Sequence, residues 1–480
     1  MEKKGQVSMA TAGLIRPAQI VGFIAAVVIL VGMQAVAPTE LLPVAARNTL
    51  AVLLAVIVLL VTETFPLGIV CLLAISLMYF LGCVESVPGA LSGFTNATLF
   101  FVLASFGISE AITVVPLSKR LLLFLMKKAG RTTGQLMFAI MAVTAVLSSV
   151  ISNVAAAAVF IPVVLNFLEV YDNEEDKRRT GKAYMISLPV ASMIGGMMTP
   201  AGSSINMLVL SMLEKNTGTT ISFVQWMALG IPITIIMLPI AWVICVKMFK
   251  PAPLEQEKIQ GYIRNASVDV PEKMTTKEKY VLVILVVMLI LWILSSWYPF
   301  LQIAPVAIIG LTLYFIPGKM QVLTWNDFKR CVSLEAFILM GTMISIGNVI
   351  TTSGLNKWIS EIIFPQTFTN STILVIAFIC LMTFLLLIPI PVAPALVGML
   401  SASLCAFCAK VGVSPALVMA AFGLCACNCY LLPLDTVPLI TYSTGYYKMF
   451  DMPKATVWIQ IILIAVASIW ISIVGGMLIG

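Results

Sequence analysis

Long apolar stretches, separated by short charged loops, run along the sequence from residue 17 to its end. A transmembrane helix needs roughly 20 such residues, whereas a soluble domain carries about 25% charged residues. Only 10% of this chain is charged, and 60% is hydrophobic. We therefore expect an all-α polytopic membrane protein surrounded by the lipid bilayer. The first apolar stretch is predicted to be a retained span rather than a cleaved signal.

About eleven of these stretches are predicted to cross the membrane. They cover residues 17–38, 48–62, 66–84, 97–117, 183–213, 226–247, 279–298, 302–317, 333–352, 413–446 and 456–478. The Lys and Arg residues gather in alternate loops, which the positive-inside rule places in the cytoplasm. The opposite loops hold only Arg47, Lys215, Lys357 and Lys410. This pattern predicts an integral protein of the plasma (inner) membrane, with its N-terminus in the cytoplasm and its C-terminus outside.

Two further apolar stretches, residues 134–170 and 371–410, must each begin and end on one side of the membrane if this charge pattern holds. A single helix over 134–170 would be about 55 Å long, far more than one crossing requires. We predict a re-entrant hairpin that enters from the cytoplasm and has SSVISN at its tip. A second hairpin, at 371–410, is predicted to enter from outside. Two short full spans are the alternative for 134–170.

Two spans are too long for one straight helix and carry helix-breaking residues at their centres. Residues 183–213 would form about 46 Å of helix. They are interrupted by GGMMTPAGSSIN at 195–206, and 413–446 is interrupted by NCYLLPLDTVP at 428–438. Irregular backbone at membrane depth survives only where protein or a wet cavity covers it. A simple Pro/Gly kink is the alternative for either span alone.

A hairpin followed by a broken span occurs twice, in opposite orientations. This arrangement is typical of the inverted repeats of secondary transporters, whose sites lie near the middle of the membrane. The predicted divisions are a tail and leading span at 1–47, a first inverted repeat at 48–250, a cytoplasmic linker at 251–278 and a second inverted repeat at 279–480.

Polar side chains at the first hairpin tip are expected to meet the first helix break near the middle of the membrane. They are Ser148, Ser149, Ser152 and Asn153. Their oxygens are hard ligands that suit Na⁺, and freed backbone N–H groups and helix N-termini attract carboxylates. No Lys or Arg is expected at this depth, so a bound cation is one means of balancing an anionic substrate. The alternative is that Ser and Asn only hold neighbouring helices together.

Asp435 is the only acid in the interior of the second broken span. An acid at membrane depth is costly and is a candidate functional residue. It has three possible roles, which are to bind Na⁺, to carry a proton, or to accept hydrogen bonds from freed N–H groups. Nearby, Cys425, Cys427 and Cys429 form CACNC, which is favoured as small helix-packing residues over a metal site. The sequence has no His, the usual metal ligand and proton relay.

Four segments together resemble the divalent anion/sodium symporter (DASS) family of di- and tricarboxylate transporters. They are VTETFPLG at 61–68, SNV at 152–154, IGGMMTPAGSSINML at 194–208 and VSPALVMAAFGLCACNCYLLPLDTVP at 413–438. The resemblance covers nearly the whole chain. It implies a homodimer that works by an elevator motion, with substrate carboxylates held by two Ser-Asn-Thr hairpin tips and a sodium ion beside each tip.

The resemblance also implies the site residues. For substrate binding they are Asn153, Val154, Ser203, Ser204, Ala393, Pro394, Thr436 and Pro438. For Na⁺ binding they are Ser148, Ser152, Asn153, Gly195, Gly202 and Asn428. Asp435 stands where the family has a small residue or Pro, and we add it to the Na⁺-binding candidates as a replacement for missing ligands. The sequence departs from the family pattern at both tips, because Val154 replaces a threonine and the second tip falls on Val392-Ala393-Pro394. The second sodium site therefore stays open at this point.

We expect a secondary active transporter of small carboxylate anions, of the C4-dicarboxylate type, coupled to Na⁺. No other cofactor, no catalytic residues and no nucleic-acid partner are expected, and the chain is not predicted to be an enzyme. The alternatives are a cation-independent or proton-linked anion:anion exchanger, or a carrier for another small anion. A carboxylate sensor would need a soluble output domain, and the longest loop, at 247–278, is too short for one.

Overall fold

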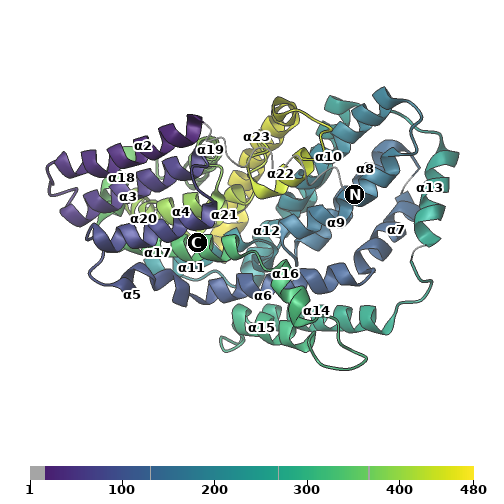
Figure 1. The fold of residues 1–480 in the computed structure, drawn as a ribbon, viewed down its shortest axis with the longest axis horizontal. Helices are drawn as coiled ribbons and strands as arrows, with labels where there is room; N and C mark the ends of the chain where they lie inside the picture. Colours follow the sequence, from purple (N-terminus) through teal and green to yellow (C-terminus); the bar gives the residue numbers. More distant parts are fainter. Residues whose placement is uncertain (1–16, 130, 269, 366–367, 480) are drawn as a thin grey trace. The chain divides into compact units, whose positions relative to one another are not determined.

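The computed structural model describes residues 17–129, 131–268, 270–365 and 368–479, and within these ranges all regular structure is helical (Figure 1). Seven helical stretches are long and apolar enough to cross a membrane. They are α2 (Pro17–Gly32) with η1 (Met33–Ala35), α3 (Val44–Val61), α6 (Ala97–Val114), α12 (Phe223–Phe249), α17 (Leu334–Thr352), α20 (Ala393–Val411) and Met449–Leu478. The expected all-α class is confirmed. Residues 1–16 of the predicted N-terminal tail lie outside the described residues.

The contacts divide the structure into two units. Unit 1 comprises Met1–Thr95 and Leu334–Phe364, and unit 2 comprises Asn96–Ser333 and Pro365–Gly480. All of the residues expected to form the site belong to unit 2.

Unit 1 is built around α3 and α17. Helix α2 packs on α3, α3 packs on α4 (Leu67–Phe80), and α17 lies against α4 and η2 (Ser92–Thr95). The backbones of α17 and η2 approach closely, because a side chain at Gly93 would collide with the carbonyl of Gly341. The Gly93 N–H also donates to Ser345 Oγ at 2.9 Å. The unit is completed by α5 (Val87–Ala90) and α18 (Leu355–Ile363).

In unit 2 the first predicted hairpin is a pair of helices joined by a short turn. Helices α8 (Thr133–Ser148) and α9 (Asn153–Leu168) are followed by α10 (Glu174–Gly196), which packs along both of them. Gly195 allows this approach, since a Cβ there would collide with the backbone of Ala145. The chain then passes through η3 (Pro200–Gly202) into α11 (Ser204–Thr217), so the predicted helix break is present.

The second half of unit 2 repeats this order of elements. Helix α19 (Thr372–Leu386) and α20 precede α21 (Pro415–Ala426), which packs on both and ends in a break before α22 (Thr436–Tyr442). The halves also pack on each other, since α11 contacts α20 and α21 while α22 contacts α9 and α10. The second part of each broken helix therefore packs against the hairpin of the other half. Helix α23 (Met452–Trp470) lies beside α12 and α19.

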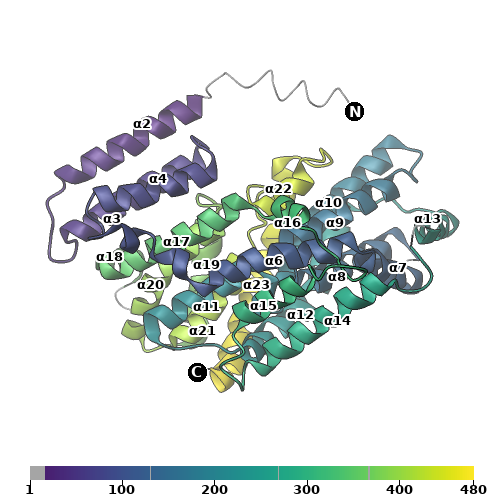
Figure 2. The ribbon, with the colours of Figure 1, turned by 60° about the horizontal axis from the view of Figure 1, so that its bottom comes forward.

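The remaining helices of unit 2 include elements that the sequence did not predict. Helix α15 (Ile303–Leu313) runs along α6, with α14 (Thr276–Leu294) against it, as Figure 2 shows. Helix α7 (Leu117–Ala129) packs on α8. Two short helices were missed. They are α13 (Gln256–Val268), inside the predicted linker, and α16 (Trp325–Cys331).

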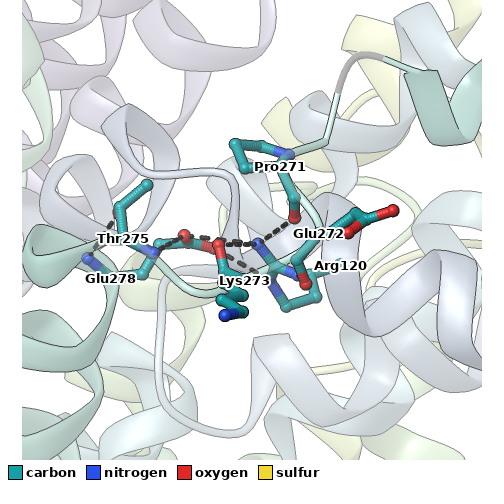
Figure 3. A network of polar contacts seen from close by, with 6 residues as sticks. All are labelled: Arg120, Pro271, Glu272, Lys273, Thr275 and Glu278. Atoms are coloured by element: carbon teal, nitrogen blue, oxygen red, sulfur yellow. Dashed lines mark hydrogen bonds and ion pairs between the residues drawn. The ribbon is translucent and has the colours of Figure 1, made fainter.

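An ion pair between the partly exposed Arg120 and the buried Glu278 fixes α7 to the start of α14. Arg120 Nε donates to Glu278 Oε1 at 3.1 Å, and Nη2 donates to the carbonyl of Pro271 at 2.8 Å (Figure 3). The side chain of Glu278 is fully buried, and its carboxylate also accepts from the backbone N–H of Thr275. Burial alone would raise the pKa of Glu278, but the hydrogen bonds from Arg120 and Thr275 outweigh it and hold that pKa below its usual value.

Candidate functional site

The first hairpin tip forms a small polar cluster inside an apolar bundle. Ser148, at the end of α8, donates from Oγ to Asn153 Oδ1 at 2.7 Å and lies 3.1 Å from Ser192 Oγ. Ser192, on α10, donates to the carbonyl of Asn153 at 2.6 Å. Ser148 and Ser192 have no solvent-exposed surface. Two predicted residues therefore meet, together with Ser192, which the sequence analysis missed because a lone serine in an apolar helix carries no pattern.

The remaining predicted residues of this tip have different roles. Ser152 caps α9, because its Oγ accepts from the backbone N–H of Ala155 at 3.2 Å. Its own N–H donates to Ser109 Oγ on α6, also at 3.2 Å. Val154 is half-buried and offers only methyl groups. The oxygen-bearing side chains of the tip are thus Ser148, Ser149, Ser152 and Asn153, and the Ser149 hydroxyl donates to the carbonyl of Val146 at 2.7 Å.

The first helix break is held against this tip by side chains on both sides of it. Thr199 Oγ1 donates to the carbonyl of Ser149 at 2.5 Å. Asn206 Nδ2 donates to the carbonyls of Gly196 and Thr199, at 2.8 and 2.9 Å, and so satisfies backbone groups that the break leaves free. Asn206 Oδ1 is buried without a partner among the residues described. A buried amide oxygen without a donor is uncommon in folded proteins.

Glycines bring the break and the tip together. A Cβ at Gly196 would collide with the side chain of Asn153. A Cβ at Gly202 would lie 2.7 Å from the carbonyl oxygen of Gly196 and 3.0 Å from that of Ser148. The 2.7 Å contact is shorter than a real Cβ atom tolerates, and the 3.0 Å contact is very tight. The expected ligand Gly202 is thus placed directly beside Ser148.

Helix α11 begins at this break, with Ser203 as its N-cap. Ser203 is buried, and its Oγ accepts from the backbone N–H of Ile205 at 3.3 Å. Ser204 is half-buried, and its side chain makes no hydrogen bond within the described part of the chain. The start of α11 therefore presents two serines beside the positive end of the helix dipole.

The second helix break contacts the first tip through the thiol of Cys427. Cys427 Sγ lies 3.6 Å from Asn153 Nδ2, which donates to it, and within reach of Ser203. Asp435 caps α22, because its Oδ1 accepts from the backbone N–H of Val437 at 3.1 Å. Asp435 is half-buried and has no ion pair with any described residue. Among its neighbours, Thr436 is exposed and Pro438 is buried.

The second hairpin tip has no polar side chain. Val392 precedes α20 without capping it, Ala393 is buried and Pro394 is half-buried. The second helix break contacts this tip through Cys429, whose Sγ lies 3.8 Å from the carbonyl of Pro391. Asn428 is fully buried, and its Nδ2 donates to the carbonyl of Leu424 at 2.7 Å. Asn428 Oδ1 has no partner in the described structure.

The cysteines of the CACNC segment do not form a metal centre in the described ranges, where no group of three or more His, Cys, Asp or Glu residues is placed to hold an ion. Every cysteine is a free thiol, and Cys425, Cys427 and Cys429 are buried.

Comparison with known proteins identifies relatives of this chain. The sodium-dependent dicarboxylate transporter SdcS of Staphylococcus aureus strain USA300 is 26% identical over 423 residues, covering 84% of this chain and 81% of that protein. SdcS of the bovine strain RF122 matches to the same extent, also at 26% identity. The crystal structure of the YdaH transporter from Alcanivorax borkumensis has a TM-score of 0.56 and 15% identity, covering 80% of this chain and 87% of that one. At this identity the likeness concerns the fold.

The family model of the sodium:sulfate symporter transmembrane region matches residues 17–480. The resemblance inferred from the four sequence motifs is thereby confirmed. The chain therefore belongs to the sodium:sulfate symporter family and is an integral membrane transporter rather than an enzyme.

Proposed function

We propose that the protein is a Na⁺-coupled secondary transporter of small carboxylate anions, of the C4-dicarboxylate type. The observation that carries this proposal is the buried Ser148–Asn153–Ser192 cluster, held by glycines against a broken helix. The relative SdcS is named as a sodium-dependent dicarboxylate transporter, which supports the substrate class and the coupling ion.

The first tip and break have the donor set that a Na⁺ ion requires. Ser148, Ser152 and Asn153 supply side-chain oxygens, and Gly202 lies beside the backbone carbonyl of Ser148. We propose that Gly195 and Gly202 contribute backbone carbonyls to the same site. These are hard ligands, which suit a hard cation. At the same break, the buried Asn206 Oδ1 accepts no hydrogen bond from the described residues, so one acceptor oxygen remains unused there. Na⁺ would add the positive charge that the surrounding side chains lack.

The substrate would be held between the two halves of unit 2. One carboxylate would lie at the start of α11, near Asn153, Ser203 and Ser204, where backbone N–H groups and the helix dipole favour an anion. The other end would meet the second tip and break. We propose that Val154 also contacts the substrate at the first tip. At the other end, the proposed contacts are Ala393 and Pro394 of the second tip, and Thr436 and Pro438 after the second break.

For the whole protein we propose about eleven spans and two re-entrant hairpins in an inverted repeat, a homodimeric assembly and an elevator motion in the plasma membrane. The N-terminus would lie in the cytoplasm and the C-terminus outside. Support for the repeat comes from the equal order of elements in the two halves and from their reciprocal packing. Such repeats place substrate and ion sites at their interface.

The test is uptake and counterflow in proteoliposomes with mono-, di- and tricarboxylates, in Na⁺ or in choline. Uptake of a C4-dicarboxylate should depend on Na⁺, and Ser148→Ala should weaken the apparent Na⁺ affinity on the order of tenfold. Ser149→Ala is a matched control, because Ser149 Oγ donates only to the carbonyl of Val146, at 2.7 Å. Uptake that is equal in choline and in Na⁺ would reject the coupling.

A second candidate is an anion:anion exchanger that needs no cation or is linked to protons, for this or another small anion. The apolar second tip, with Asp435 as the neighbouring carboxylate, is the observation that favours it. Uptake that requires an anion inside the vesicle, and that persists without Na⁺, would select this candidate.

A further inference from the structure

The carboxamide of Asn153 is held at both of its polar atoms. Its Oδ1 accepts from Ser148 Oγ at 2.7 Å, and its Nδ2 donates to Cys427 Sγ at 3.6 Å. Ser148 belongs to the first hairpin, whereas Cys427 follows α21 as its C-cap in the second half of unit 2. A Cβ at Gly196 would collide with the same carboxamide, so the space around it is closed on that side. Both halves of unit 2 therefore act together on one amide group.

A carboxamide has two orientations of nearly the same shape, which differ by a half-turn that exchanges its oxygen and its nitrogen. In the orientation present, the oxygen of Asn153 faces Ser148, a proposed Na⁺ ligand, and the nitrogen faces the thiol of Cys427. After a half-turn, an N–H group would face Ser148 and the oxygen would face Cys427. An N–H group repels a cation, and a carbonyl oxygen repels a carboxylate. Only the present orientation therefore suits both Na⁺ and an anionic substrate.

The serines alone do not favour this orientation. Ser192 Oγ donates its single hydrogen to the carbonyl of Asn153 at 2.6 Å. Because Ser148 Oγ donates its own hydrogen to Asn153 Oδ1, none remains between Ser148 and Ser192, although their oxygens lie 3.1 Å apart. With the amide turned, Asn153 Nδ2 would donate to Ser148, and Ser148 would donate to Ser192. That chain places a hydrogen in every contact, so without a cation the serines by themselves favour the turned amide.

Cys427 supplies the opposite preference. Its Sγ lies 3.9 Å from the carbonyl of Met193, to which the thiol donates its only hydrogen. The sulfur can then only accept, and the donor that it faces is Asn153 Nδ2. Ser203, the N-cap of α11, lies within hydrogen-bonding reach of the same sulfur. Cys427 is 3% exposed, so water does not readily take the place of the sulfur in these contacts.

The contacts of the sulfur hold Asn153 Nδ2 near the start of α11. The second N–H group of Nδ2 has no partner among the described residues, and Asn153 is half-buried. An amide donor and the start of a helix both attract a carboxylate. We propose that Cys427 is a positioning residue for the substrate. Its sulfur holds the Asn153 carboxamide with the nitrogen toward the substrate carboxylate and the oxygen toward the cation.

This proposal rests on the proposed carboxylate transport at the first tip, and its test separates hydrogen bonding from packing. Cys427→Ser keeps an acceptor in a smaller side chain, whereas Cys427→Val fills the space without an acceptor. Two concentrations are measured for a C4-dicarboxylate at saturating Na⁺. One is the KM of uptake in proteoliposomes, and the other gives half-maximal thermal stabilisation of the full-length protein in detergent.

Cys427→Val should raise both concentrations on the order of tenfold, because a misdirected amide loses a hydrogen bond to a charged group. The maximal rate of uptake should fall much less than the affinity. Cys427→Ser should stay close to wild type in both measurements. A role in packing alone predicts the reverse order, with Cys427→Val close to wild type and Cys427→Ser impaired.

Cys425→Val is the matched control, because Cys425 is fully buried in the same helix and its thiol pairs with Cys380 on α19 instead of the tip. It should keep the KM of wild type. If Cys427→Val does not fold, Cys427→Ala takes its place, since it also lacks an acceptor. Equal KM values for Cys427→Ala and Cys427→Ser would then overturn the proposal.

The remaining outcomes separate this proposal from the proposed function. A Cys427→Val protein with the dicarboxylate affinity of wild type would overturn the positioning role and leave carboxylate transport intact. The same holds for a Cys427→Ser protein that binds as weakly as Cys427→Val. Wild type that neither takes up the dicarboxylate nor is stabilised by it would overturn the proposed function, and the role of Cys427 with it.

Discussion

At the scale of single residues, the site depends on glycines as much as on its polar side chains. The motif SSVISN was enough to predict that Ser148, Ser152 and Asn153 lie at a hairpin tip, because polar residues in an apolar stretch need a reason. Ser192 had no such signal. Its role comes from its position on α10, and only the packing of α10 along the hairpin reveals it.

We predict that Gly202→Ala disrupts the site while leaving the rest of the fold in place. The added methyl group would press on the carbonyls of Gly196 and Ser148, which are backbone and cannot turn away. The expected cost is about 1–3 kcal/mol of packing strain, with loss of Na⁺-dependent uptake. Gly261→Ala is the control, since no atom lies within 4 Å of the position a Cβ would take there. Equal uptake by the two variants would contradict the prediction.

At the scale of elements, the positions of the hairpins and helix breaks were predicted from hydropathy and charge, not from helix propensity. The hairpins and breaks follow from stretches that are too long for one crossing, and the structure has helix ends near the predicted positions. Helices α13 and α16 were missed because they are short and lie in polar loops, where neither hydropathy nor the charge rule gives a signal. The ion pair that joins α7 to α14 was also not predicted, because Arg120 and Glu278 are far apart in sequence.

Arg120→Met should destabilise the protein strongly. It would leave the carboxylate of Glu278 buried without its guanidinium partner, and breaking a buried pair costs about 3–5 kcal/mol. Arg179→Met is the comparison, because Arg179 pairs with Asp176 at 3.1 Å on the surface of one helix. A surface pair contributes at most about 1 kcal/mol. Thermal unfolding in detergent measures both, and equal shifts in the two variants would refute the argument.

At the scale of the whole molecule, the sequence predicted hairpins and helix breaks in unit 2, but it could not predict how the two halves of that unit pack on each other. Reciprocal packing of α11 on α20 and of α22 on α9 depends on side-chain shapes that no hydropathy pattern records. The halves of unit 2 are also joined by Asp451. It accepts from Lys182, on α10, at 2.9 Å and from Lys454 at 2.8 Å.

This junction predicts how stability depends on pH. Burial raises the pKa of Asp451, but hydrogen bonds from Lys454, the backbone N–H of Lys448 and Lys182 lower it by more. The pKa of Asp451 is therefore held well below its usual range. The stabilisation should be complete above about pH 5 and decline as pH falls below the unfolded value near 3.9. Asp451→Asn should cost about 1–3 kcal/mol at pH 7. The difference between this variant and wild type should narrow toward pH 3 in thermal unfolding, and a constant difference would contradict it.

The backbone contact between Gly195 and Ala145 has a mechanical consequence. A hairpin that touches its neighbour only through side chains is free to swing open, whereas α8 and α10 meet backbone to backbone and are bonded again from Thr199 to Ser149. The first tip and break should therefore behave as one stiff piece. Amide hydrogens in α8 and in the last turns of α10 should exchange with deuterium at a common, slow rate. An ion bound between the tip and the break would then stay enclosed by both of them, because neither would move relative to the other.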